Sequence, residues 1–321
     1  MSLTDASGIS FLLEWAIDQL RQGKHSSWQS MEEWWQAFRR QRQDWAMPID
    51  QAVLGGVLAD RVGYAFAAGY QAALHRLDPS LPADRVASLS VTEEGGGHPQ
   101  AIESTLVDDG IGGFVLNGRK KWATMSADGG LALVAASIGT DEQGRNRLRV
   151  ARVDLGAPGV TIEAMPATEF VPEIHHCRLA FDGVPVAADA LLPGDGYSEY
   201  VKPFRTLEDI YVTTAVLTYL LGISLRNEWP REVNERIVAL LVNLRGLGLA
   251  DPRSPAVHVA LEGALRTRQQ ITDSLGPHWD SVEPSERARW ARDQPLVAIA
   301  GRVRVMRADA AWEKLRTKRE R

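Results

Sequence analysis

The sequence predicts an α+β protein built in three successive parts, because the spacing of its apolar residues changes twice along the chain. Roughly the first 80 residues carry apolar side chains at helical spacing, the middle holds short apolar runs between turn residues, and helical spacing then returns and continues to the end. We therefore expect an N-terminal helical domain at residues 1–86, a central β domain at 87–196 and a C-terminal helical bundle at 197–321.

The N-terminal part contains three amphipathic segments. Their apolar residues recur every three or four positions, as expected for helices that bury one face. The segments are Ile9–Leu20, Ser30–Trp45 and a third that begins after Pro48 and continues to Phe66. The tryptophans of the second segment recur at helical spacing, which favours packing in a core over an exposed binding surface.

The central part is expected to form strands. Its short apolar or alternating runs are separated by Gly, Asp and Asn turns, a spacing typical of an antiparallel barrel or sandwich. The runs are Ala87–Val91, Gly113–Leu116, Leu131–Val134, Arg147–Val153 and Arg178–Phe181. Asn117-Gly118 predicts a hairpin, because both central positions of its preferred turn need positive φ.

The C-terminal part predicts four helices, which are enough for a bundle. The prolines of this region fall between the periodic stretches, where they do not interrupt helical hydrogen bonds. The predicted helices lie near Leu207–Arg226, Glu232–Arg245, Pro255–Ser274 and Ser285–Leu315.

Composition excludes several classes of function. The chain has 321 residues and a net charge of −5, so no overall basic field favours nucleic acid or an anionic membrane. The N-terminus lacks the pattern of a secretory signal, the one cysteine cannot form an internal disulfide, and polar residues interrupt the most apolar windows. We therefore expect a cytoplasmic protein with no membrane span and no nucleic-acid partner.

Glu173-Ile-His175-His176-Cys177 contains residue types that bind metals. Adjacent positions on a strand point to opposite faces, so these side chains do not converge on one ion. We expect no metal site here.

Two motifs in the central part suggest a family. One is Thr92-Glu-Glu-Gly-Gly-Gly97, and the other is Leu116-Asn-Gly-Arg-Lys-Lys-Trp-Ala-Thr124. They resemble the Thr-Glu-Pro-x-x-Gly-Ser and Leu-Asn-Gly-x-Lys-x-Trp-Ile-Thr motifs of the acyl-CoA dehydrogenase family, and the segment Leu179–Gly196 resembles the sequence with which that family leaves its β domain. The resemblance is to a divergent, shortened member. It implies an N-terminal helical domain, a central antiparallel β-barrel domain, a C-terminal four-helix bundle and an FAD cofactor.

The resemblance also implies which residues bind the cofactor. Thr92 would contact the flavin, and Trp122 and Thr124 would border its ring. The amides of the glycine segment that ends at Gly97 can hold phosphate oxygens. His98 stands where the family has a phosphate-contacting serine, and its ring nitrogen can replace that hydroxyl as a donor.

The usual catalytic base of the family is absent, because the chain contains no Tyr-Glu-Gly-Thr element near its C-terminus. Some members instead carry a glutamate in the first helix after the β domain, and Glu208 is our candidate for that base. Counting from Leu192 puts the position at Glu208 or Asp209, whereas counting back from Leu221-Gly222 puts it near Val212. A carboxylate that caps the helix start is the competing interpretation of Glu208.

Three functions follow from the resemblance. The first is an FAD-dependent oxidoreductase that acts on the α and β carbons of an acyl-CoA or other acyl thioester, with an electron-transfer flavoprotein as electron acceptor. The second is a flavin-dependent monooxygenase of the same fold. The third is a non-catalytic acyl-CoA-binding or partner homologue. By kinship we expect a homodimer or homotetramer.

Overall fold

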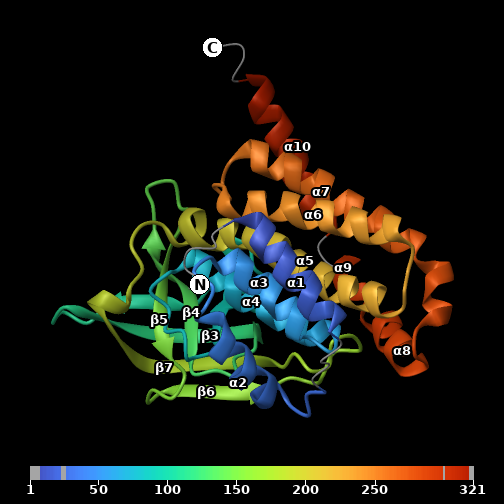
Figure 1. Ribbon diagram of the computed structural model, residues 1–321. Helices are drawn as coiled ribbons and strands as arrows, with labels where there is room; N and C mark the ends of the chain where they lie inside the picture. The colour runs from blue at the N-terminus through green and yellow to red at the C-terminus, as the bar shows by residue number, and fades with distance from the viewer. Residues whose placement is uncertain (1–7, 23–26, 299–300, 318–321) are drawn as a thin grey trace. The chain divides into compact units, whose positions relative to one another are not determined.

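The computed structural model describes residues 8–22, 27–298 and 301–317, which form two compact units (Figure 1). The helical unit comprises Met1–Arg76, Glu169–Val171 and Thr206–Arg321, and the sheet unit comprises Leu77–Thr168 and Pro172–Arg205. Helices precede and follow the strands along the chain, as the pattern of apolar residues predicts. The limits of the three predicted domains stay a prediction.

The N-terminal helices are α1 (Ile9–Arg21), α2 (Met31–Arg42), α3 (Pro48–Leu58) and α4 (Val62–Leu77). The prediction of one continuous helix from Pro48 to Phe66 was wrong. Ala59 adopts an extended conformation, and the residues after it bind Trp28: Asp60 accepts a hydrogen bond from its amide, and Arg61 donates one to its carbonyl. These polar contacts stabilise the interruption between α3 and α4.

The C-terminal helices are α5 (Lys202–Arg226), α6 (Arg231–Leu249), α7 (Pro255–Ser274), α8 (Pro284–Asp293), α9 (Pro295–Ala298) and α10 (Gly301–Thr317). The expected single last helix, and with it the simple four-helix count, was wrong. Pro295 stands at the start of α9, where the missing amide hydrogen and the ring disfavour continuation of α8. The predicted helix at Pro255–Ser274 is confirmed.

By length and composition one described helix could span a membrane, namely Tyr197–Arg226, which includes α5 and the π-helical turn before it. However, 83% of its most apolar window is buried inside the protein. That burial is the pattern of a core helix.

The sheet unit is built on a single curled sheet. Its strands are β1 (Ala87–Ser90), β2 (Thr105–Asp108), β3 (Gly113–Thr124), β4 (Leu131–Thr140), β5 (Asn146–Asp154), β6 (Val160–Ala164) and β7 (His176–Ala187). The order is β1-β4-β2-β3-β7-β6, with β5 paired to β4. One face of β3, β4, β5 and β7 buries a core that includes Leu116, Val134 and Phe181.

The sheet corrects the prediction of an antiparallel barrel in part. Most pairings are antiparallel, but β1 and β2 each pair with β4 in parallel. The chain reverses twice between β2 and β4, so these strands run in the same direction. Among the described strands the order is an open path, so the sheet is a curled half-barrel and not a closed one.

The predicted hairpin at Asn117-Gly118 was also wrong. β3 continues through both residues and pairs with β7 on either side, with an irregularity between Leu116 and Gly118. Gly118 has a φ of 140°, and the side chain of Asn117 accepts a hydrogen bond of 2.8 Å from the amide of Gly183. The two residues therefore form a bulge, because long-range pairing outweighs the local turn preference.

Candidate functional site

The two predicted motifs lie side by side in the sheet unit. The turn Thr92–Gly97 follows β1, and Trp122 and Thr124 lie near the end of β3. The backbone amide of Lys121 donates to the carbonyl of Thr92 over 2.8 Å. Motifs that are separate in the sequence are thus brought together by one main-chain hydrogen bond.

The turn presents its last glycine to the hydroxyl of Thr92. Glu93 and Gly96 exchange two backbone hydrogen bonds of 3.0 Å, and Gly96 has a φ of 107°, which glycine tolerates. A Cβ added to Gly97 would lie 3.3 Å from Oγ1 of Thr92. The absence of a side chain at Gly97 therefore keeps the surface around this hydroxyl open.

His98 is exposed and begins a short 3-10 turn. Its Nδ1 accepts a hydrogen bond of 3.3 Å from the amide of Gln100. An accepting Nδ1 requires the proton of the neutral ring to be on Nε2. The ring of His98 is therefore oriented by the loop and retains one N–H donor.

Trp122 occupies a strained bulge. It has a φ of 59°, it lies where the pairing of β3 with β7 shifts between Lys120 and Ala123, and the residue is 46% exposed. A positive φ is costly for an aromatic residue, and a bulge reorients the side chain. The β3 strand thus presents an indole at the surface of the sheet unit, although its neighbour Ala123 is fully buried.

Sequence reasoning missed His176, which contacts both predicted residues of β3. Its ring meets that of Trp122 edge-on, with centroids 5.5 Å apart and planes at 75°. Its Nδ1 lies 3.3 Å from Oγ1 of Thr124, the residue that it opposes in the sheet. Its position on the outward face of an alternating strand is the signal that could have identified it.

Two effects keep His176 neutral near pH 7. Burial lowers its pKa below the ordinary value of 6.5, and the neighbouring His175 lowers the pKa further. A neutral imidazole offers one donor and one acceptor. The cluster of Trp122, Thr124 and His176 therefore combines an apolar wall with uncharged hydrogen-bonding groups.

A buried network beneath the turn was also missed. Glu93 accepts from Lys120 Nζ at 2.5 Å, from Ser104 Oγ at 2.7 Å and from the amide of Glu103 at 2.7 Å. Burial lowers the pKa of Lys120 to about 8, although Glu93 opposes the shift. Since this network joins the turn to β2 and β3, it fixes the position of the candidate site.

Glu208 is part of α5 and belongs to the helical unit, whereas the residues described above belong to the sheet unit. Its side chain is half-buried. The adjacent Asp209 is engaged at both oxygens, by Arg304 over 2.7 Å and by Arg307 over 2.7 Å. Of the two carboxylates, Asp209 therefore has a structural role in joining α5 to α10.

The described residues contain no group of three or more histidine, cysteine, aspartate or glutamate side chains that could hold a metal ion. Within the segment that carries metal-binding residue types, His175 Nδ1 lies 2.9 Å from Asp128, and Cys177 is buried. Along β7 the half-buried His176 is followed by the buried Cys177, which is the alternation expected of a strand.

The sequence of the sheet unit matches a known domain. Residues 88–184 match the model of the acyl-CoA dehydrogenase middle domain. A curated relative, benzylmalonyl-CoA dehydrogenase of Aromatoleum aromaticum, is 28% identical over 149 residues, which are 46% of this chain and 37% of that protein. The matched region thus spans well under half of the relative's length.

Solved structures share the fold over nearly the whole chain. Butyryl-CoA dehydrogenase of Megasphaera elsdenii superposes with a TM-score of 0.66 at 14% identity and covers 95% of this chain and 97% of its own. The FAD complex of PigA gives a TM-score of 0.64 at 14% identity, with 97% of each chain covered. Residues 88–184 therefore resemble the acyl-CoA dehydrogenase middle domain, and the chain shares the fold of these solved structures.

Proposed function

We propose that the chain is an FAD-dependent oxidoreductase that acts on the α and β carbons of an acyl thioester. The observation that carries this proposal is the proximity of the Thr92–Gly97 turn to the bulge that presents Trp122, joined by the Lys121–Thr92 hydrogen bond. The relative benzylmalonyl-CoA dehydrogenase supports a CoA-thioester substrate, and the FAD complex of PigA supports FAD. We further propose a cytoplasmic homo-oligomer with an electron-transfer flavoprotein as electron acceptor.

The residues present fit a flavin nucleotide. A half-exposed indole offers a flat apolar surface of the size that an aromatic ring system covers. Because Gly97 has no side chain, the space beside Oγ1 of Thr92 stays open, and a Cβ at this position would narrow it. His98 supplies an N–H donor at the place where the family has a serine hydroxyl, so a phosphate can be bound there without that hydroxyl.

Each residue then has a separate task. Trp122 forms a wall for the ring, and Thr124 and the neutral His176 provide hydrogen-bonding groups at its edge. Thr92 and Gly97 bind polar atoms next to the ring, and His98 binds a phosphate oxygen. When bound, FAD supplies the acceptor for a hydride from the β carbon of the substrate.

Glu208 is our candidate for the base that removes the α proton. The reaction needs a carboxylate with an available lone pair. Both oxygens of the neighbouring Asp209 accept hydrogen bonds from arginines, so Asp209 is a poor base. Glu208 stays the candidate that the count from Leu192 gives, and the count that leads to Val212 reaches no carboxylate.

An absorption spectrum tests the proposal. The purified protein is incubated with FAD, separated from unbound FAD, and scanned in the visible range before and after anaerobic addition of a panel of acyl-CoA esters. Flavin bands that bleach with one ester class are the expected result. Protein that takes up no FAD would contradict the redox function, and substrate-dependent oxygen consumption with a hydroxylated product would assign it to the monooxygenase class.

A further inference from the structure

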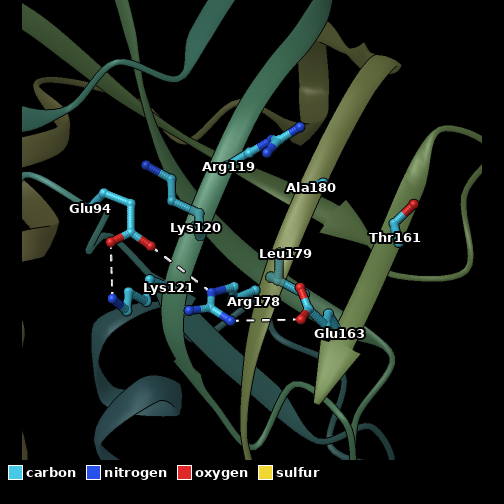
Figure 2. A pocket seen from close by; sticks show the side chains of 9 residues that line it. All are labelled: Glu94, Arg119, Lys120, Lys121, Thr161, Glu163, Arg178, Leu179 and Ala180. Atoms are coloured by element: carbon cyan, nitrogen blue, oxygen red, sulfur yellow. Dashed lines mark hydrogen bonds and ion pairs between the residues drawn. The ribbon is translucent and has the colours of Figure 1, made fainter. Parts of the chain in front are cut away.

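A groove of about 450 Å³ lies on the outward face of β3, β6 and β7 (Figure 2). Its volume is within the range of pockets that bind small molecules. Nothing in the proposed function uses it. Arg119, Lys121 and Arg178 contribute cationic groups to its lining, and Glu94 and Glu163 contribute carboxylates.

The strand register places a row without acidic residues across the groove. Arg119 of β3 opposes Ala180 of β7, and Ala180 opposes Thr161 of β6. Because Ala180 has only a methyl group, it leaves space between the guanidinium of Arg119 and the hydroxyl of Thr161. The next row, two residues along β7, contains Arg178 opposite Glu163, so the carboxylate of Glu163 lies to one side of Ala180.

The two arginines retain donors for a ligand. Within the described part of the chain, the side chain of Arg119 makes no hydrogen bond or ion pair (Figure 2). Arg178 lies 3.9 Å from Glu94 and 3.6 Å from Glu163, distances beyond a hydrogen bond. Each guanidinium carries five N–H donors in a planar fork that matches an oxyanion.

The charge balance of the groove favours an anion. Lys120 also lines it, but its ammonium group is bound to the buried Glu93 and does not contribute. The cations that remain, Arg119, Lys121 and Arg178, outnumber the two carboxylates. Lys121 lies 2.9 Å from Glu94, but Glu94 is 75% exposed, so solvent screens this pair and it exchanges readily.

We propose that this groove binds the phosphate group of a small phosphorylated molecule. The phosphate lies over Ala180 between Arg119 and Thr161, and Arg178 donates from the adjacent row. Two guanidinium forks, a hydroxyl and a nearby ammonium group supply enough donors for three terminal phosphate oxygens, more than a carboxylate uses. The site is separate from the residues assigned to FAD and does not depend on the proposed function.

Titration of the apo protein with inorganic phosphate at constant ionic strength tests the proposal, with sodium acetate as the carboxylate comparison. Amide shifts in the NMR spectrum report the site. Saturable shifts confined to the facing parts of β3, β6 and β7, tighter for phosphate than for acetate, are the expected result. Shifts that never saturate, or that are spread over all basic surfaces, would overturn the proposal.

Three variants sharpen the test. Arg119→Gln removes a charged donor, and we expect phosphate affinity to fall about tenfold or more. Arg147→Gln is the matched control, because this arginine is exposed on β5 and does not line the groove. Glu94→Gln removes a carboxylate that competes for Lys121 and Arg178, so affinity is expected to rise.

An equal loss in Arg119→Gln and Arg147→Gln would show non-specific charge attraction and would contradict the site. FAD titration of the same variants separates this proposal from the flavin assignment. Unchanged FAD affinity in Arg119→Gln is expected for an independent site. A parallel loss of FAD and phosphate affinity would instead assign the groove to a phosphate of FAD and would overturn the proposal of a separate ligand.

Discussion

Nζ of Lys120 lies 2.5 Å from Oε1 of Glu93, with 0% and 7% of the two side chains exposed. This pair joins the turn that follows β1 to the centre of β3. Removal of one partner leaves an uncompensated buried charge, so we expect Lys120→Met to lower the free energy of unfolding by about 3–5 kcal/mol. Urea denaturation followed by circular dichroism measures the loss.

Lys121→Met is the matched control, because Lys121 is the next residue of the same strand and pairs with the exposed Glu94. We expect little change in stability, since solvent screens such a pair. Equal losses in the two variants would refute the special role of the buried pair.

The same pair predicts a dependence of stability on pH. Burial alone raises the pKa of Glu93, but Lys120 and the surrounding donors bring it below the ordinary 4.5. The folded state thus binds fewer protons at Glu93 than the unfolded state does. The stabilising contribution of Glu93 is therefore complete above pH 4.5 and is lost as pH falls through its folded-state pKa. Thermal unfolding between about pH 3 and 6 is expected to show a smaller acid loss in Glu93→Gln than in the natural protein. An identical slope in both proteins would contradict this account.

Local sequence patterns predicted most helices and strands here, because apolar spacing reports which face of an element is buried. The predicted helices at the N-terminus of the chain and at α5 to α7 occur near the expected residues. Predictions from local patterns were wrong where contacts with residues distant in the sequence determine the local structure. The Asn117-Gly118 turn preference yielded to pairing with β7, and Trp28 stabilises an interruption after α3 that helical spacing did not show.

The candidate site was likewise predicted from the sequence only in part. The family resemblance of two motifs predicted Thr92 and Trp122 as site residues, because each motif is a short continuous segment that can be recognised in the sequence. His176 contacts Thr124 across 52 positions of the sequence, and the contact depends on the register of β3 against β7. The sequence alone suggests that Lys120 is exposed, like its basic neighbours. The fold shows that it is buried against Glu93.

The indole of Trp122 predicts a loss of flavin affinity on truncation. We expect Trp122→Ala to weaken FAD binding about tenfold, because an aromatic contact of this kind contributes roughly 1–2 kcal/mol. Quenching of FAD fluorescence on binding measures the affinity. Trp312→Ala is the control, since Trp312 is exposed to a similar degree, 53% against 46%, and belongs to the helical unit. Unchanged affinity in Trp122→Ala would remove this residue from the cofactor site.

Glu208 and Asp209 predict opposite phenotypes. Glu208→Gln is expected to retain FAD and to slow thioester-dependent bleaching about 10²–10⁴-fold, the usual contribution of a general base. Asp209→Asn is expected to retain bleaching but to loosen α10, because it weakens the contacts with Arg304 and Arg307. Stopped-flow absorbance measures the first effect, and hydrogen exchange of α10 measures the second. Full bleaching rates in Glu208→Gln would exclude it as the base.

Gly69 predicts a loss of stability when one methyl group is added. A Cβ there would lie 2.6 Å from Cα of Val212 and 2.7 Å from the carbonyl oxygen of Tyr211, so α4 and α5 cross too closely for a side chain. Backbone atoms cannot rotate aside, and we expect Gly69→Ala to cost about 1–3 kcal/mol or more.

Gly246→Ala is the matched control in α6, because nothing lies within 4 Å of its added Cβ. Helix propensity alone then acts, and we expect a gain of about 0.5–1 kcal/mol. Thermal unfolding of both variants gives the comparison. Since each exchange adds the same methyl group to a helix, a change of the same sign in both would contradict the close crossing of α4 and α5.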